Sequence, residues 1–157
     1  MDKIFVCLGT PIAIFDSIGP MVGSKLQDLG YEVYGTMEEP IHGTNVKAYW
    51  DSTIKKIDKQ RVVSIDAALS SKLKPGALVH RRKGVIPRAG IDKSFNNIEI
   101  GSNSIVGIVG NNIDNVITSE NKIKEMANDI KKFMNGEDDN KIKSQVFNNM
   151  KKASEEL

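Results

Sequence analysis

The chain has 157 residues, of which 39% are hydrophobic and 27% are charged, and its formal net charge is +2. This length fits one domain with one core, and the interspersed Lys, Asp and Glu residues exclude the concentrated basic surface of a typical nucleic-acid-binding protein. The single cysteine excludes an internal disulfide framework, and no run approaches the roughly 20 apolar residues of a membrane-spanning helix.

Predicted strands and helices alternate along the first half of the chain. Residues 4–8 form an uninterrupted apolar run, which predicts a strand buried on both faces. Apolar residues recur at helical spacing from Ile18, and Gly30 is expected to end this helix. Asp16 or Ser17 is a candidate for its N-cap.

The next three predicted elements continue the same alternation. A second strand is expected at residues 31–35. Thr44 can cap a helix that carries apolar residues on one face as far as Ile57. Residues 61–67, with the sequence RVVSIDA, predict a third strand.

Further strands are expected at residues 76–82 and 96–110, with a Gly/Pro loop at residues 83–90 between them. A helix is predicted from Ser119 to Gly136. We therefore expect an α/β fold, a three-layer α/β/α sandwich around a mostly parallel sheet, with residues 1–136 as its single domain. Residues 137–157 are expected to form a C-terminal helix or a flexible tail.

Two aspartates occupy comparable places in this predicted fold. Asp16 follows the first strand, and Asp66 lies at the end of the third. If these strands are neighbours, both carboxylates lie at the carboxyl edge of the sheet, where α/β proteins bind ligands. Such a pair can share one proton and act as general base and general acid, or bind a divalent metal. The alternative is that each aspartate only caps a helix.

The remaining polar candidates are less distinctive. His42 lies close in sequence to Glu39 and Asn45, and this group can orient a base or contribute a metal ligand, or form an ordinary exposed loop. His80 is expected to be structural or solvent-facing rather than a ligand. Ser17 does not occupy a nucleophile elbow, and the glycines of this region do not follow the dinucleotide pattern.

Several stretches together resemble the YyaC family of sporulation proteins, which is related to the spore germination protease and to hydrogenase maturation proteases. The matching stretches are VCLGT at 6–10, DSIGPMVGSKL at 16–26, VYGTMEEPIHGTN at 33–45, SIDAALS at 64–70 and GIVG at 107–110, with IPRAGI at 86–91 as a weaker match. The resemblance implies a phosphorylase/hydrolase-like α/β/α fold. It also implies that Asp16 and Asp66 are the catalytic pair and that Glu39, His42 and Asn45 line the substrate site.

The resemblance also implies a sporulation-associated peptidase that hydrolyses spore or other proteins in the cytoplasm of the forespore or mother cell. No cofactor is required, although the hydrogenase maturation proteases make a divalent metal held by Asp16, Asp66 and His42 an alternative. The expected partner is a protein or peptide substrate, with a homo-oligomer as a further option and with neither nucleic acid nor membrane.

This chain departs from the family pattern beside Asp16. Relatives usually carry an acid and an arginine where this chain has Pro11 and Ile12, and a glycine where it has Phe15. An apolar wall is expected to raise the pKa of Asp16, because desolvation disfavours the charged carboxylate. It also keeps a second function open, that of an inactive member that binds a protein partner through Ile12, Ile14 and Phe15. A metal-dependent hydrogenase-maturation-type protease is the third.

Overall fold

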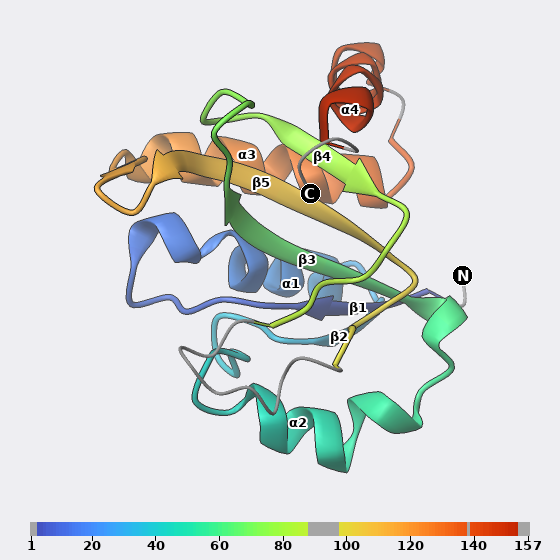
Figure 1. The fold of residues 1–157 in the computed structure, drawn as a ribbon. Helices are drawn as coiled ribbons and strands as arrows, with labels where there is room; N and C mark the ends of the chain where they lie inside the picture. Colours follow the sequence, from blue (N-terminus) through green and yellow to red (C-terminus); the bar gives the residue numbers. More distant parts are fainter. Residues whose placement is uncertain (1–2, 88–97, 138, 154–157) are drawn as a thin grey trace.

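The computed structural model describes residues 3–87, 98–137 and 139–153 (Figure 1). Its strands are β1 (Ile4–Cys7), β2 (Glu32–Tyr34), β3 (Val62–Leu69), β4 (Leu78–Arg81), β5 (Asn103–Asn112) and β6 (Asn115–Val116). Its α-helices are α1 (Ile18–Asp28), α2 (Val46–Ser52), α3 (Glu120–Met134) and α4 (Asn140–Ala153). The 3-10 turns are η1 (Ile14–Asp16), η2 (Ile54–Lys56) and η3 (Lys59–Arg61).

The described strands form one sheet in the order β2-β1-β3-β5-β4, with β6 paired to β5. Strands β2, β1, β3 and β5 run parallel, whereas β4 and β6 pair antiparallel with β5. The condition on which the paired-aspartate hypothesis depends is met, since β1 is a neighbour of β3 and pairs with it from Ile4 to Cys7. The mostly parallel sheet is confirmed as well.

Helices cover both faces of this sheet, which confirms the three-layer sandwich (Figure 1). On one face, α1 and α3 pack together over Phe5, Ile65 and Ile105. On the other face, α2 packs through Val46 against Val6. A strand buried on both faces needs a continuous apolar run, and the sequence of β1 supplies one; β3 is buried from Val62 to Ile65 and includes Ser64 in that stretch. No helix in the described part of the chain is long and apolar enough to cross a membrane.

Several boundaries differ from the predicted ones. The helix expected from Thr44 to Ile57 is α2 followed by η2, because Thr53 departs from helical backbone angles. Consecutive β-branched residues at Thr53 and Ile54 favour this break. The strand expected at 96–110 begins only at Asn103, and its first two residues lie outside the described residues. The predicted loop at 83–90 is described only as far as Pro87.

The residues that cap the helices agree only in part with the predicted ones. Ser119 caps α3 as predicted, since its side chain accepts a hydrogen bond from the backbone N–H of Lys122. Ser17, one of the two predicted candidates, is the N-cap residue of α1, but its side chain makes no capping hydrogen bond, and its hydroxyl donates to the carbonyl of Ile14 instead. Asn45, rather than Thr44, precedes α2, and it also makes no side-chain cap.

The C-terminal segment contains α4, which packs against β4 at the edge of the sheet (Figure 1). Ile142 and Val146 are buried in the same core as α1 and α3. Of the two forms expected for residues 137–157, a helix is therefore present in the described part.

Candidate active site

The candidate site lies where the chain reverses its direction of winding. From β1 the chain passes through α1 to β2, and from β2 it passes through α2, on the opposite face, to β3 on the other side of β1. The carboxyl ends of β1 and β3 are thus a topological switch point, at which α/β sheets form a crevice. A cleft of about 120 Å³ opens there, lined by Leu8, Gly9, Asp16, Ile41, His42, Gly43, Val46, Asp66 and Pro87.

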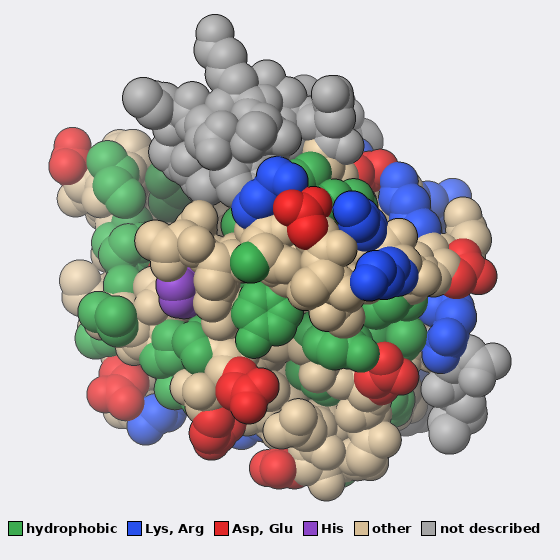
Figure 2. All heavy atoms as spheres, turned by 90° about the horizontal axis from the view of Figure 1, so that it is seen from below, with side chains coloured by type: hydrophobic (Ala, Val, Ile, Leu, Met, Phe, Trp, Pro, Cys, Tyr) green, Lys and Arg blue, Asp and Glu red, His purple; other side chains and the backbone are tan. Residues whose placement is uncertain are grey.

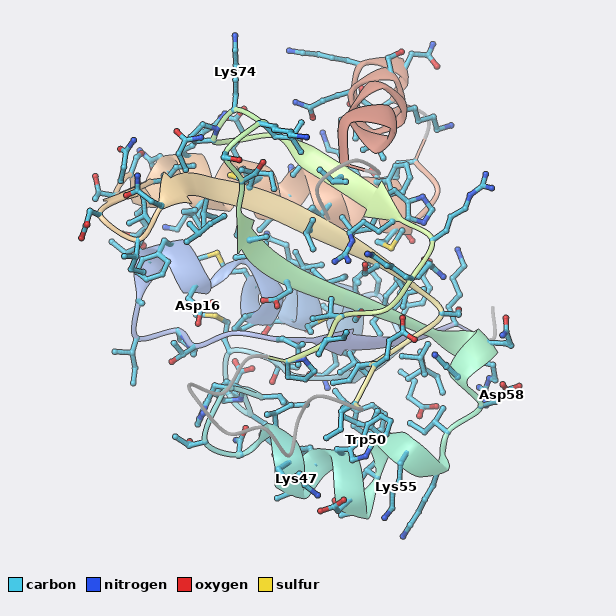
Figure 3. All side chains as sticks on the ribbon, viewed as in Figure 1. Asp16, Lys47, Trp50, Lys55, Asp58 and Lys74 are labelled. Atoms are coloured by element: carbon cyan, nitrogen blue, oxygen red, sulfur yellow. The ribbon has the colours of Figure 1, made fainter. Side chains whose placement is uncertain are left out.

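Asp16 reaches this cleft from the loop that follows β1. It is the last residue of η1, and its carboxylate oxygen Oδ2 accepts a hydrogen bond from the backbone N–H of Thr10 at 3.2 Å. The same N–H also donates to the backbone carbonyl of Asp16 at 3.0 Å. Figure 3 shows Asp16 near the carboxyl ends of the strands, at the opposite end of the sheet from Asp58. The carboxylate therefore closes the loop back toward β1 instead of capping α1.

This close return depends on Gly9. The backbone of Gly9 has a φ of +140°, and an added Cβ would lie 2.2 Å from the carbonyl oxygen of Asp16. The N–H of Gly9 donates to the carbonyl of Ile41 at 2.9 Å, which also ties the loop that carries His42 to the end of β1. A glycine here lets three segments of the cleft wall approach one another.

Asp66 reaches the cleft from within β3. Pairing between β1 and β3 ends at Cys7 and Ile65, whereas β3 continues beyond Asp66 to Leu69. Asp66 is therefore the first β3 residue beyond the end of β1. It does not end its strand, as the sequence suggested, and it does not cap a helix. Its Oδ1 accepts a hydrogen bond from the N–H of Ala67 at 2.8 Å.

Burial raises the pKa of both aspartates. Desolvation is the main cause for Asp66, whose pKa is raised to about 8; the N–H of Ala67 opposes the shift, and the charge of Asp16 adds to it. Desolvation also raises the pKa of Asp16, against the opposing effects of the Thr10 N–H and of His42. The raised pKa expected for Asp16 is thus confirmed in direction, but Pro11, Ile12 and Phe15, which were expected to form the apolar wall, do not line the cleft, and Ile12 is 94% exposed. At neutral pH Asp66 holds its proton while Asp16 ionises first.

His42 lines the same cleft, and its ring is oriented from within its own loop. The backbone N–H of Thr44 donates to Nδ1 of His42 at 3.3 Å, and the Thr44 hydroxyl lies 2.8 Å from the same nitrogen. A backbone N–H can only donate, so Nδ1 of His42 accepts in this arrangement, and Nε2 is the ring nitrogen that carries a proton.

Asn45 holds the His42 loop together. Its Oδ1 accepts from the N–H of His42 at 2.8 Å, and its Nδ2 donates to the carbonyl of Pro40 at 3.0 Å. Asn45 is not among the residues that line the cleft. Its direct effect in the structure is on the position of His42, and the substrate contact predicted for it stays a prediction.

Glu39 belongs to a different hollow. It lines a second cavity beside β2, whereas His42, three residues later, lines the cleft of the two aspartates. The sequence placed the two residues in one loop but did not indicate that their side chains face different cavities. His80 is structural in its contacts: it pairs with Asn103, and its ring lies edge-on to Phe133.

The metal alternative fits the described residues poorly. Among them, no three His, Cys, Asp or Glu side chains are grouped closely enough to hold a metal ion. Asp16, Asp66 and His42 share a cleft without forming such a group.

Two further features of the cleft were not predicted. Pro87 lines it from the segment after β4, a segment that the sequence indicated only as a loop. The charge of Arg81, on β4, lowers the pKa of Asp66 and so partly offsets the desolvation. The antiparallel return of β4 beside β5 brings Arg81 toward Asp66, and the local pattern of a basic strand end contained no signal of this.

Comparisons with known proteins agree with the fold and with the resemblance noted above. The chain is 33% identical over 109 residues to "Uncharacterized protein YyaC" of Bacillus subtilis (strain 168), a match that covers 68% of this chain and 52% of the relative. The matched region thus spans about half the length of that relative.

Two solved structures are similar in fold. A [NiFe] hydrogenase maturation protease, HybD, from Thermococcus kodakarensis matches with a TM-score of 0.55 at 20% identity, covering 87% of this chain and 98% of the other. An uncharacterized protein from Wolinella succinogenes matches with a TM-score of 0.51 at 12% identity, covering 87% and 96%. Both likenesses show the fold.

The family is shown by a further match, over residues 1–134, to the model described as "Protein of unknown function (DUF1256)". This range includes β1 through α3 and every residue of the aspartate cleft. The chain therefore belongs to this family and is related to the Bacillus protein YyaC.

Proposed function

We propose that the chain is a peptidase-like protein that hydrolyses peptide bonds through Asp16 and Asp66. The observation that carries the proposal is that both carboxylates line one cleft at the switch point of the sheet, with their pKa values raised to different extents. Carboxyl groups whose surroundings separate their pKa values are suited to opposite roles in acid–base catalysis. The fold likeness to a maturation protease supports a protein substrate.

In the proposed reaction, ionised Asp16 takes a proton from a water molecule in the cleft. The water oxygen attacks the carbonyl carbon of the peptide bond, and the protonated Asp66 donates its proton to the leaving nitrogen as the C–N bond breaks. The products are a carboxylic acid and an amine, and one proton exchange through solvent restores the two aspartates. His42, oriented by Thr44, would donate from Nε2 to the carbonyl oxygen as negative charge develops there.

Hydrolysis of denatured spore proteins and of a mixed peptide library tests this mechanism. New N-termini would be counted by mass spectrometry for the wild type and for Asp16→Asn and Asp66→Asn, between pH 4 and pH 9. Each substitution should slow cleavage by about 100-fold or more, because general acid–base catalysis typically contributes that much. Asp51→Asn, an exposed substitution on α2, is the matched control. Cleavage at the wild-type rate by both site variants would exclude the aspartate mechanism.

A second function, peptide or protein binding without cleavage, is favoured by the exposed apolar side chains beside the cleft. Ile12 is 94% exposed and Ile14 is 41% exposed in the loop that leads to Asp16. Exposed apolar groups of this kind are used in protein contacts. If the wild type cleaves nothing across the pH range yet retains library peptides, and Ile12→Ser releases them, binding is the function. Sporulation, as the setting of either function, is part of the proposal.

A further inference from the structure

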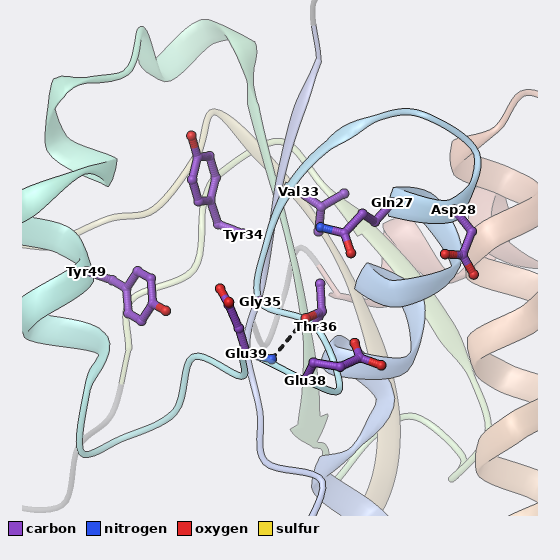
Figure 4. A pocket seen from close by; sticks show the side chains of 9 residues that line it. All are labelled: Gln27, Asp28, Val33, Tyr34, Gly35, Thr36, Glu38, Glu39 and Tyr49. Carbon is purple, nitrogen blue, oxygen red and sulfur yellow. Dashed lines mark hydrogen bonds between the residues drawn. The ribbon is translucent and has the colours of Figure 1, made fainter.

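A second and larger hollow lies at the open edge of the sheet, separate from the aspartate cleft. It measures about 330 Å³, within the range of about 300–1,000 Å³ typical of ligand pockets. Its lining residues are Gln27, Asp28, Val33, Tyr34, Gly35, Thr36, Glu38, Glu39 and Tyr49. Figure 4 shows that they come from the end of α1 on one side, from α2 on the other, and from β2 and its following loop between them. We call this hollow the β2-edge groove.

Strand β2 forms the floor of the groove and is an edge strand. It pairs with β1 on one side, and no described strand pairs with its other side. Alternate backbone N–H and C=O groups of such a strand point away from the sheet. An extended peptide can add to an edge of this kind through main-chain hydrogen bonds, with its alternate side chains entering pockets beside the strand.

The charge of the groove specifies which side chain would enter. Three carboxylates line it, those of Asp28, Glu38 and Glu39, together with the rings of Tyr34 and Tyr49, and its lining contains no Lys, Arg or His. The whole chain, in contrast, has a net charge of +2. In Figure 2, which views the molecule from below Figure 1, on the side of α2, most Lys and Arg side chains lie toward the upper right, and several Asp and Glu side chains lie close together at the lower left.

The backbone of Glu39 is fixed while its carboxylate remains exposed. The N–H of Glu39 donates to the hydroxyl of Thr36 at 3.0 Å, and the N–H of Thr36 donates to the carbonyl of Glu39 at 3.1 Å. Figure 4 shows the Glu39 side chain extending between Tyr49 and Gly35. The turn therefore presents this carboxylate to the groove with little cost in backbone ordering on binding.

The spacing of the carboxylates favours an extended organic cation over a metal ion. Among the described residues no three acidic side chains are grouped closely enough to hold a metal, although three of them line this hollow. They are therefore spread around it. A guanidinium group is planar, pairs with carboxylates through several N–H donors and stacks on aromatic rings.

We propose that the β2-edge groove binds an extended peptide segment that pairs with β2 and inserts an arginine side chain beside Glu39 and Tyr49, which lie next to one another in Figure 4, while Asp28 and Glu38 add to the negative charge of the groove. Residues 41–43, which follow Glu39, line the aspartate cleft, so one loop separates the two sites. A bound segment would place its neighbouring residues beside that cleft. Whether the bound peptide is then cleaved rests on the proposed peptidase function, but its binding to the groove does not.

Fluorescence anisotropy with a labelled, end-capped heptapeptide of Ser and Thr around a central Arg tests the proposal. The control peptide has citrulline, the neutral isostere, in place of Arg. The full-length Asp16→Asn protein is used, so that cleavage does not consume the probe. The Arg peptide should bind at least about tenfold more tightly than the citrulline peptide, and the difference should shrink at high salt, because exposed charges are screened.

The double variant Asp28→Asn/Glu39→Gln should remove this preference, whereas Glu120→Gln/Glu125→Gln, an equal change of charge on exposed positions of α3, should keep it. N-methylation of alternate amides of the peptide should also weaken binding if it pairs with β2. Equal affinity for both peptides, or unchanged affinity in the groove variant, would overturn the inference. Arginine-dependent binding by a wild type that cleaves nothing would refute the peptidase proposal and leave the groove assignment intact.

Discussion

The charge of Asp16 raises the pKa of Asp66, although the two residues are fifty positions apart and belong to different elements of the fold. The interaction exists because β1 stops at Cys7 while β3 continues, which leaves a gap into which the loop after β1 returns Asp16. The same gap desolvates both carboxylates. Both the proximity of the two carboxylates and their desolvation therefore follow from the unequal lengths of β1 and β3.

Asp66→Asn should stabilise the protein at alkaline pH. Between about pH 4 and about pH 8 the folded protein retains a proton on Asp66 that an unfolded aspartate, with a pKa near 3.9, has lost. The unfolded state therefore binds fewer protons, and the wild-type free energy of unfolding falls as pH rises through this window. The variant, which lacks this titration, should gain up to about 5 kcal/mol relative to wild type between pH 4 and pH 8, because a shift of about four pKa units corresponds to about 1.4 kcal/mol per unit.

Urea denaturation at pH 4, 6 and 8 measures this effect. Asp51→Asn is the control with the opposite sign, because the hydrogen bond from Lys47 lowers the pKa of Asp51. Its carboxylate stabilises the wild type at higher pH, and that contribution is lost as pH falls. A difference between Asp66→Asn and wild type that does not change with pH would contradict the raised pKa of Asp66.

Gly9→Ala should unfold or strongly destabilise the chain. An added Cβ would lie 2.2 Å from the carbonyl oxygen of Asp16, on a backbone with a φ of +140°. We expect a loss of about 3 kcal/mol or more, since both the clash and the backbone conformation oppose a side chain. Gly30→Ala separates the two effects: Gly30 has a φ of +97° with nothing within 4 Å of its Cβ, so only about 1–2 kcal/mol should be lost. Thermal unfolding of both variants gives the comparison, and equal losses would argue against the clash.

Asn45→Ala should loosen the loop that carries His42. The substitution removes hydrogen bonds to the N–H of His42 and to the carbonyl of Pro40, and we expect a loss of about 1–2 kcal/mol. Asn45→Asp keeps the acceptor for His42 and removes the donor to Pro40, so it should lose less and leave the His42 ring signals in the NMR spectrum nearly unchanged. If Ala shifts those signals no more than Asp does, Asn45 does not position His42.

Ile142→Ala should show that α4 contributes to the main core. Ile142 is 6% exposed and packs with Val146 in the cluster that includes α1 and α3. Removing a buried isoleucine side chain typically costs about 2–5 kcal/mol. Ser144→Ala, an exposed position on the same helix, is the control and should change the free energy of unfolding by less than about 0.5 kcal/mol. A similar small effect for Ile142→Ala would mean that α4 folds apart from the core.

Local sequence was sufficient for the elements whose signal is short-range. The apolar run of β1 and the periodic pattern of α3, capped by Ser119, appear where they were predicted, and β3 begins one residue after its predicted start. The alternation of strands and helices was enough to predict the mostly parallel three-layer fold. Burial on two faces and helical spacing are properties of neighbouring residues, so a single sequence records them directly.

Only the tertiary structure shows which groups the side chains of the candidate site contact and which cavity each of them lines. Asp16 satisfied the pattern of an N-cap, yet its carboxylate bonds Thr10, because the Gly9 turn brings that N–H to it. Glu39 and His42 are three residues apart in the sequence but line different cavities. The charge of Arg81 lowers the pKa of Asp66 because β4 returns antiparallel beside β5 and brings Arg81 toward it. The sequence by itself determined which residues are candidates for the chemistry and which elements they follow. The lengths of paired strands and the path of the loops determined which residues meet, because those depend on contacts between distant segments that no local pattern encodes.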